Sequence, residues 1–191
     1  NKIILIMKKI IIIGAGAMGS AFTVPCLENK NDVTLVGTHL EDELINNIKS
    51  NNNFHPVLST KLPLELKVEK FEKLSSILEG GVDIIVAGIS SIGIKWFVDQ
   101  ISKNYKTNLP IILLTKGLAI EENELMTLSD KIKKLLKEKG HTEVNVSAIK
   151  GPCLAAGLAN KMRTGTVIAN PNIKETEILK KIIATDYYST E

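Results

Sequence analysis

Short apolar runs alternate along the chain with segments whose apolar residues recur at helical spacing. The apolar runs are expected to form strands at 8–13, 32–36, 66–68, 83–87, 110–114, 144–149 and 164–169, with a last extended piece at Tyr187 and Tyr188. The helical patterns fall at 17–29, 40–51, 71–78, 94–103, 125–139, 153–159 and 174–183. Residues 52–65 contain Asn, Pro and Ser and are expected to be irregular.

The order of these elements predicts an α/β fold. The strand segments are continuous apolar runs and do not alternate with polar residues, which is typical of a sheet covered by helices on both faces. We therefore expect a doubly wound, mostly parallel sheet in a three-layer α/β/α arrangement.

Length and charge limit the other possibilities. The chain has 191 residues, enough for one domain of good size, and a net charge of only +3. Arg163 is its only arginine, which argues against nucleic acid as a partner. No apolar run approaches the ~20 residues that a membrane span needs, so membrane insertion is not expected. Residues 1–7 are interpreted as a non-native or upstream extension, with Met7 a candidate start, and residues 8–191 as one domain.

The cysteines and histidines predict neither a disulfide framework nor a metal site. Cys26 and Cys153 are the only cysteines, so reduced thiols and a cytoplasmic location are expected. The three histidines show no spacing suited to zinc.

The strongest local signal is a glycine-rich turn between the first strand and the first helix. Residues 14–19 read Gly-Ala-Gly-Ala-Met-Gly, the G-x-G-x-x-G pattern of a Rossmann-like dinucleotide site. Gly14 permits the tight turn, Gly16 lets a pyrophosphate approach the backbone, and Gly19 lets helix and strand pack closely. The backbone N–H groups at the start of this helix, with the positive end of the helix dipole, favour an anion. The predicted cofactor is NAD or NADP.

The choice between these two cofactors stays open. A carboxylate at the end of the second strand favours NAD and a basic residue favours NADP. Here Thr38 and His39 follow that strand, and the acidic Glu41 and Asp42 come only later. His39 is either a contact for a 2′-phosphate or an ordinary surface histidine.

Three further loops follow strands at the same predicted edge of the sheet. Lys116 follows 110–114 and can donate to a substrate oxygen or phosphate, although it can also be an ordinary loop lysine. Gly151 follows 144–149 and permits close approach of a ligand, but fits a plain turn equally well. Ser90 either lines the cofactor groove or helps to cap the helix near residue 94. Cys153 is not predicted to be a nucleophile, because the sequence places no histidine to activate it.

Together these motifs resemble the N-terminal domain of NAD(P)-dependent glycerol-3-phosphate dehydrogenases. The matching stretches are Gly-Ala-Gly-Ala-Met-Gly-Ser-Ala at 14–21, Thr-Lys-Gly-Leu at 115–118, Gly-Pro-Cys-Leu-Ala at 151–155 and Thr-Asp-Tyr-Tyr at 185–188. The resemblance implies hydride transfer between the nicotinamide and dihydroxyacetone phosphate or sn-glycerol 3-phosphate. It implies that Lys116 contacts substrate and cofactor, that Gly151 and Cys153 contact substrate, and that Ala17, Met18 and Ala155 contact the cofactor.

The chain departs from this family in two respects. Gly157 stands where the family usually has an acidic residue, and the chain ends at Glu191, where the family's helical substrate domain, with its proton-transferring lysine, would begin. We therefore expect residues 8–191 to be a dinucleotide-binding domain that turns over poorly by itself and whose full-length form is a homodimer. The alternatives are a ketopantoate reductase of the same architecture and a nucleotide-sensing domain without catalytic activity.

Overall fold

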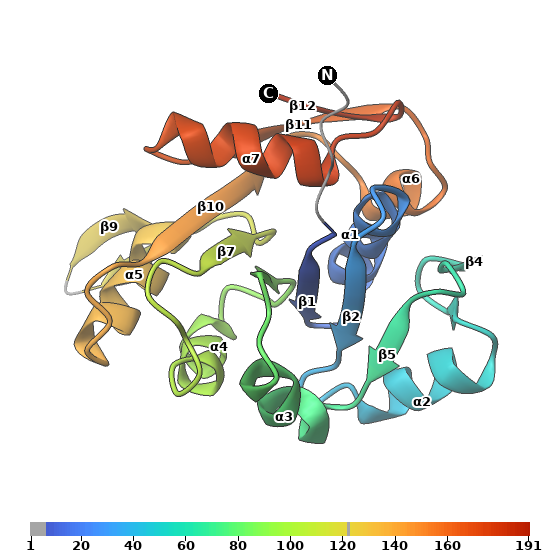
Figure 1. Cartoon of the computed structure of the whole chain (residues 1–191), viewed down its shortest axis with the longest axis horizontal. Coiled ribbons are helices and arrows are strands. Elements are labelled where there is room, and N and C mark those ends of the chain that lie inside the picture. The colour runs from blue at the N-terminus through green and yellow to red at the C-terminus, as the bar shows by residue number, and fades with distance from the viewer. Residues whose placement is uncertain (1–6, 122) are drawn as a thin grey trace.

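The computed structural model describes residues 7–121 and 123–191, in which helices cover both faces of an eight-stranded sheet (Figure 1). The predicted three-layer, Rossmann-like α/β class is therefore confirmed. The extension expected at residues 1–7 lies outside the described residues, except for Met7. Within the described part, none of the helices has the length and apolar character to cross a bilayer.

The sheet runs in the order β12-β11-β10-β7-β6-β1-β2-β5. Its strands are β1 (Lys9–Ile13), β2 (Asp32–Val36), β5 (Lys67–Glu69), β6 (Ile84–Ala87), β7 (Pro110–Leu113), β10 (Asn145–Lys150), β11 (Thr164–Ala169) and β12 (Tyr188–Thr190). Neighbouring strands are parallel except for β10 and β11, where Ile149 pairs with Ile168. In the parallel part, Ile13 pairs with both Val36 and Ala87, so the ends of β1, β2 and β6 are aligned.

The side chains of β1 explain why an uninterrupted apolar run forms the centre of the sheet. Ile10 and Ile12 pack into a core with one group of helices, and Ile11 and Ile13 into a core with the other. Successive strand residues point to opposite faces, so both faces require apolar side chains. The helices of the first core are α1 (Ala17–Glu28), α2 (Asp42–Ser50), α6 (Ala155–Ala159) and α7 (Ile173–Ile183); those of the second are α3 (Leu74–Glu79), α4 (Ile94–Ile101) and α5 (Leu128–Glu138).

The structure corrects the sequence prediction at two hairpins. Residues 118–121 and 124–127 form the paired strands β8 (Leu118–Glu121) and β9 (Glu124–Thr127), so the helix expected at 125–139 begins only at Leu128. The side chain of Thr127 accepts a hydrogen bond from the N–H of Asp130 and so fixes the helix start there. The second hairpin, β3 (Phe54–His55) and β4 (Thr60–Lys61), lies in the segment expected to be irregular.

Other boundaries shift by smaller amounts. The helix expected at 71–78 is a 3₁₀ turn, η1 (Phe71–Lys73), that leads into α3, and the helix expected at 153–159 begins at Ala155. Helix α1 continues through Pro25.

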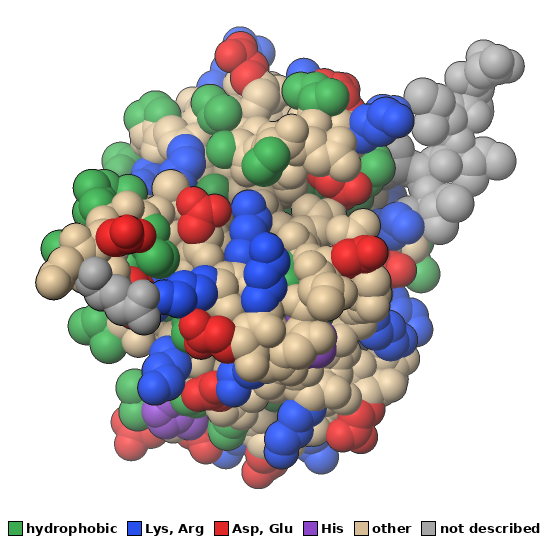
Figure 2. All heavy atoms as spheres, turned by 90° about the vertical axis from the view of Figure 1, so that its left-hand side faces the viewer, with side chains coloured by type: hydrophobic (Ala, Val, Ile, Leu, Met, Phe, Trp, Pro, Cys, Tyr) green, Lys and Arg blue, Asp and Glu red, His purple; other side chains and the backbone are tan. Residues whose placement is uncertain are grey.

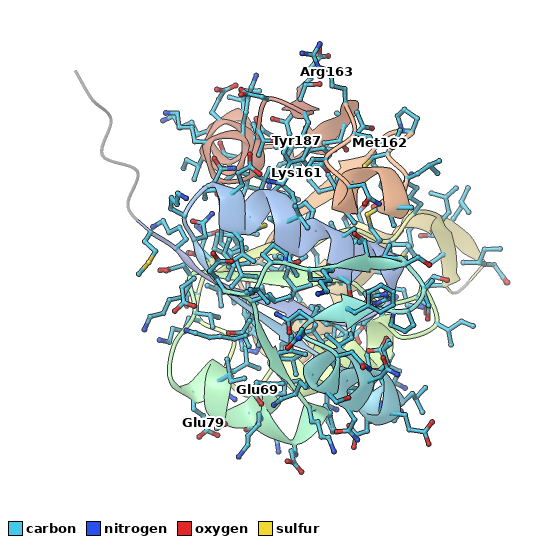
Figure 3. The ribbon with its side chains drawn as sticks, turned by 90° about the vertical axis from the view of Figure 1, so that its right-hand side faces the viewer. Glu69, Glu79, Lys161, Met162, Arg163 and Tyr187 are labelled. Carbon is cyan, nitrogen blue, oxygen red and sulfur yellow. The ribbon has the colours of Figure 1, made fainter. Side chains whose placement is uncertain are left out.

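A cluster of polar groups ties the end of the chain to α1. The Glu28 carboxylate pairs with Lys161 at 2.6 Å and accepts a hydrogen bond from the Tyr187 hydroxyl at 3.2 Å. The Lys161 ammonium also lies 5.8 Å from the centre of the Tyr187 ring, and both side chains are seen above α1 in Figure 3. These contacts, with the hydrogen bond to Lys161 as the main cause, lower the pKa of Glu28. Burial raises the pKa of Tyr187 to about 12.

Candidate functional site

The predicted site loops meet at one edge of the sheet, because they all follow parallel strands. The N–H of Gly14 donates to Val36 O at 2.8 Å, and the N–H of Gly88 donates to Ile13 O at 2.8 Å. The N–H of Leu114 donates to Ala87 O at 3.1 Å. These bonds extend the ladder past the strand ends and place the loops after β1, β2, β6 and β7 side by side. In open α/β sheets this carboxyl edge is where ligands bind.

Three glycines let the first strand, the first helix and the β6 loop approach each other closely. A Cβ at Gly19 would lie 2.2 Å from Gly14 O, and a Cβ at Gly14 would lie 2.3 Å from Gly88 O. A Cβ at Gly88 would lie 2.9 Å from the Cα of Gly19. Gly14 also has a φ of +107°, which glycine adopts without strain. Gly14 and Gly19 therefore serve the packing roles that the motif predicts.

Gly16 differs from these glycines because nothing in the protein crowds it. Among the described atoms, a Cβ at Gly16 would have one neighbour within 4 Å, Glu41 Oε1 at 4.0 Å. The φ of Gly16, −62°, is ordinary for any residue. The start of α1 has no side-chain cap and no acidic side chain in its first turn, and the N–H groups of such a helix start favour an anion. In the G-x-G-x-x-G pattern the middle glycine is the one that lets a ligand approach the backbone.

The peptide groups around Ala15 are held in place by side chains from distant segments. The Glu41 carboxylate accepts hydrogen bonds from the N–H of Ala15 at 2.9 Å and from that of Thr38 at 2.7 Å. The carbonyl of Ala15 accepts a hydrogen bond from the Ser20 hydroxyl at 2.9 Å. His55, which is fully buried, places Nε2 at 2.9 Å from the same carbonyl.

The hydrogen bonds of His55 fix its tautomer. Its Nδ1 accepts a hydrogen bond from the N–H of Leu58 at 3.2 Å, so the proton of the neutral ring is on Nε2 and is donated to Ala15 O. The backbone of the glycine turn is therefore held by hydrogen bonds from side chains of the protein itself.

Thr38 and His39, the two residues predicted to contact the cofactor after β2, lie in different surroundings. Thr38 lies beside the glycine turn, since its N–H shares the Glu41 carboxylate with Ala15. His39 is exposed, and its ring packs against Trp96 at 5.0 Å and Phe71 at 6.1 Å between centroids. The three rings are tilted against one another and form a small aromatic cluster beside the end of β2. The carboxylate of Glu41, the residue before α2, lies at the end of β2, where it accepts hydrogen bonds from the N–H groups of Thr38 and Ala15.

Ser90 is exposed at the carboxyl end of β6. Helix α4 begins after Gly93 without a side-chain cap, so the capping role considered for Ser90 is not realised. Its backbone carbonyl accepts the N–H of Gly93 at 3.0 Å. The Ser90 hydroxyl therefore has no structural role in the helix start.

Two lysines connect the loops after β7 and β10. Lys116 Nζ donates to Gly151 O at 2.5 Å, and Lys150 Nζ donates to Thr115 O at 2.9 Å. Gly151 has a φ of +140°, and a Cβ there would lie 3.2 Å from the Cα of Thr166. Gly151 is therefore required both by its conformation and by its packing. The structure brings Lys116 and Gly151 together, as predicted.

Cys153 lies beneath this loop. It is 5% exposed and packs into the core, and burial raises the pKa of its thiol. A raised thiol pKa is the opposite of what a nucleophilic cysteine requires. Ala155 begins α6, which packs against α1, and is partly buried against the same core.

Sequence reasoning missed Glu41, His55 and Lys150. Glu41 was noted only as lying beyond the expected position, and His55 only as unsuited to zinc. Lys150 directly precedes the glycine of a predicted loop, which is the signal that would have identified it. Among the described residues there is no group of three or more His, Cys, Asp or Glu side chains placed to bind a metal ion.

Comparison with known proteins identifies the family. The family model described as "NAD-dependent glycerol-3-phosphate dehydrogenase N-terminus" matches residues 9–176. An NADP(+)-dependent glycerol-3-phosphate dehydrogenase of Archaeoglobus fulgidus is 32% identical over 182 residues, which cover 94% of this chain and 52% of the relative. A glycerol-3-phosphate dehydrogenase [NAD(P)+] of Mesoplasma florum is 30% identical over 183 residues, covering 95% and 52%. The chain thus spans about half the length of the curated relatives that it matches.

Solved structures agree on the fold. The crystal structure of glycerol-3-phosphate dehydrogenase from Coxiella burnetii superposes with a TM-score of 0.78 at 21% identity, covering 96% of this chain and 53% of that one. The enzyme of Dunaliella salina gives a TM-score of 0.81 at 16% identity, covering 97% and 33%. The matching family is the one that the motifs predicted, and not the ketopantoate reductases. The chain belongs to the NAD-dependent glycerol-3-phosphate dehydrogenase N-terminus family.

Proposed function

We propose that this chain is the cofactor-binding part of an NAD(P)-dependent oxidoreductase that interconverts dihydroxyacetone phosphate and sn-glycerol 3-phosphate. The observation that carries the proposal is the open space at Gly16, in front of an uncapped helix start and between two glycines that the fold itself requires. The family's description and the names of the relatives supply the substrate.

In this proposal the glycine turn holds the dinucleotide. The N–H groups of Ala17 and Met18 donate to its pyrophosphate, with the positive end of α1 adding to the attraction. Thr38 and the exposed ring of His39 contact the adenosine end, near the carboxyl end of β2. Ser90 and Ala155 line the remainder of the groove. When bound, the cofactor supplies a nicotinamide ring that accepts or donates a hydride.

Lys116 is the proposed contact to the substrate oxygen. Its ammonium is held at the carbonyl of Gly151, and one N–H of the three is used there. A second N–H aimed at the carbonyl oxygen of dihydroxyacetone phosphate stabilises the negative charge that develops on that oxygen during reduction. Because the Cys153 side chain is buried, its proposed substrate contact, like that of Gly151, is made by the backbone.

The proposal includes a second domain in the functional enzyme. General acid catalysis contributes about 10²–10⁴-fold, and the family's proton-transferring lysine would lie past Glu191. The chain by itself is then expected to bind dinucleotide and to turn over poorly. We further propose that the full-length enzyme is a homodimer. We also propose a cytoplasmic location, which the two free cysteines support.

Calorimetric titration with NADH, then NADPH, then dihydroxyacetone phosphate tests the proposal. Binding of a dinucleotide at micromolar concentration, lost in Gly16→Ala, is expected. Failure of both dinucleotides to bind would refute the cofactor site. Lys116→Met distinguishes an enzyme from a nucleotide-sensing domain. The chain is joined to the family's second domain and assayed with and without this substitution. An enzyme should lose activity in the variant, whereas a sensing domain shows no activity in either form.

A further inference from the structure

The His55 ring is a buried polar group that the proposed function does not use. Figure 2 shows Lys, Arg, Asp and Glu side chains spread over one outer face of the molecule, whereas the His55 ring is fully buried. The residue belongs to the β3–β4 hairpin and lies 40 residues along the chain from Ala15, which it contacts. Burying a polar ring costs free energy unless the ring is hydrogen-bonded, so both of its nitrogen atoms require partners.

Both ring nitrogens have partners, and the two hydrogen bonds reach different parts of the protein. Nδ1 accepts the N–H of Leu58 at 3.2 Å within the hairpin segment, and Nε2 donates to Ala15 O at 2.9 Å in the glycine turn. Leu58 and Leu62 are buried in the core that contains α1 and so anchor the segment around the hairpin. His55 therefore connects an anchored hairpin to the glycine turn.

The bond from His55 acts on the peptide unit between Ala15 and Gly16. In a planar trans peptide the C=O and the N–H point in opposite directions, so the orientation of Ala15 O sets that of the Gly16 N–H. This carbonyl is fixed from the protein interior by His55 Nε2 and the Ser20 hydroxyl, each at 2.9 Å and both on fully buried residues. The Gly16 N–H therefore points away from them, and among the described residues the structure gives it no protein acceptor.

The two hydrogen bonds on Ala15 O also strengthen the donor at the other end of the peptide. Hydrogen bonds accepted by a carbonyl polarise the peptide and make its N–H a better donor to an anion. A donor whose direction is already fixed loses less conformational freedom when a ligand binds. The Ser20 hydroxyl belongs to α1 itself, whereas His55 ties the turn to a separate segment.

We propose that His55 is a positioning residue for the dinucleotide, which it orients by holding Ala15 O so that the Gly16 N–H faces the pyrophosphate. This inference rests on the proposed function. To that function it adds a residue that affects cofactor affinity without touching the cofactor.

Two substitutions separate the two hydrogen bonds of His55. The Oδ1 atom in His55→Asn takes the place of Nδ1 and accepts the N–H of Leu58, but this side chain is too short to reach Ala15. In His55→Gln the amide N–H takes the place of Nε2 and donates to Ala15 O, while the acceptor for Leu58 is lost. A role in orienting the turn requires the glutamine variant to restore what the asparagine variant loses.

Calorimetric titration with NADH measures this difference. The dissociation constant should rise about tenfold in His55→Asn, the effect of weakening one hydrogen bond to a charged group, and stay within about twofold of the wild type in His55→Gln. A merely structural role would instead make affinity follow the midpoint of thermal unfolding in both variants. The matched control is His141→Asn, which should leave affinity unchanged, because His141 bonds Ser102 O at 2.8 Å, outside the glycine turn.

Two results would overturn the proposal: wild-type affinity in a folded His55→Asn variant, or an equal loss of affinity in His55→Asn and His55→Gln. The amide NMR resonance of Gly16 gives a second measurement that needs no cofactor. It should shift in His55→Asn and stay near its wild-type position in His55→Gln, because the polarisation of this peptide depends on the bond to Ala15 O. Failure of the wild type to bind either dinucleotide would refute the proposed function, whereas an unmoved Gly16 resonance in His55→Asn would refute the role of His55.

Discussion

Gly16→Ala should weaken dinucleotide binding without destabilising the fold. The new methyl group meets no atom of the described protein closer than 4.0 Å, and the backbone at Gly16 has φ −62° and ψ 173°, which alanine adopts freely. Replacing glycine at a compatible position stabilises a protein by about 0.4–1 kcal/mol, because the unfolded chain loses freedom. For a chain of this size the midpoint of thermal unfolding should then stay constant or rise by about 1–3 °C.

The same substitution should abolish tight binding of the cofactor. The methyl group projects into the space in front of the α1 start, where a pyrophosphate must approach the backbone. We expect the dissociation constant for NADH to rise by about tenfold or more. A variant that is as stable as the wild type and binds NADH equally well would refute our explanation of the open space at Gly16.

Gly19→Ala is the matched control for steric effects within the same turn. Its Cβ would lie 2.2 Å from Gly14 O, so backbone would have to move by about 1 Å in a close-packed region, at a cost of about 1–3 kcal/mol. Unfolding followed by circular dichroism should show a midpoint lower by about 2–10 °C. Equal effects of the two substitutions on stability would contradict the distinction between a packing glycine and a binding glycine.

Three further predictions concern side chains around the site and the chain end. His55→Ala should lower the free energy of unfolding by about 1–3 kcal/mol, because it leaves the buried N–H of Leu58 without its acceptor; urea titration measures this, and an unchanged value would contradict it. Glu41→Gln should raise the affinity for NADPH relative to NADH in calorimetry, since it removes a negative charge near the expected 2′-phosphate position; a constant ratio would rule out this role. The pKa of Tyr187 is raised by burial to about 12 from the usual value near 10, so the neutral phenol stabilises the fold below pH 10 and this contribution is lost as the pH rises to about 12. In urea titrations between pH 10 and about 12, Tyr187→Phe should therefore lose less stability than the wild type. Equal losses of stability in the two proteins would refute the link between the ionisation of Tyr187 and unfolding.

Elements whose signal is local were predictable from the sequence. The run at 8–13 and the glycine pattern at 14–19 both specify their conformation within a few residues, and the structure has β1 and the turn into α1 there. The start of α5 was misplaced because Leu125 continues the helical periodicity, although it belongs to β9, and the Thr127 cap sets the actual boundary. Periodicity predicts that a helix exists, but capping decides where it begins.

Contacts between distant segments were not predictable. Glu41 is 26 residues from Ala15, and His55 is 40 residues from it, yet Glu41 binds the N–H and His55 the carbonyl of this one residue in the glycine turn. Neither residue lies in a recognisable motif, and the hairpin that carries His55 was expected to be irregular. The glycine turn is thus specified by a local motif, but the hydrogen bonds that hold its backbone come from distant segments, for which a single sequence gives no periodic signal.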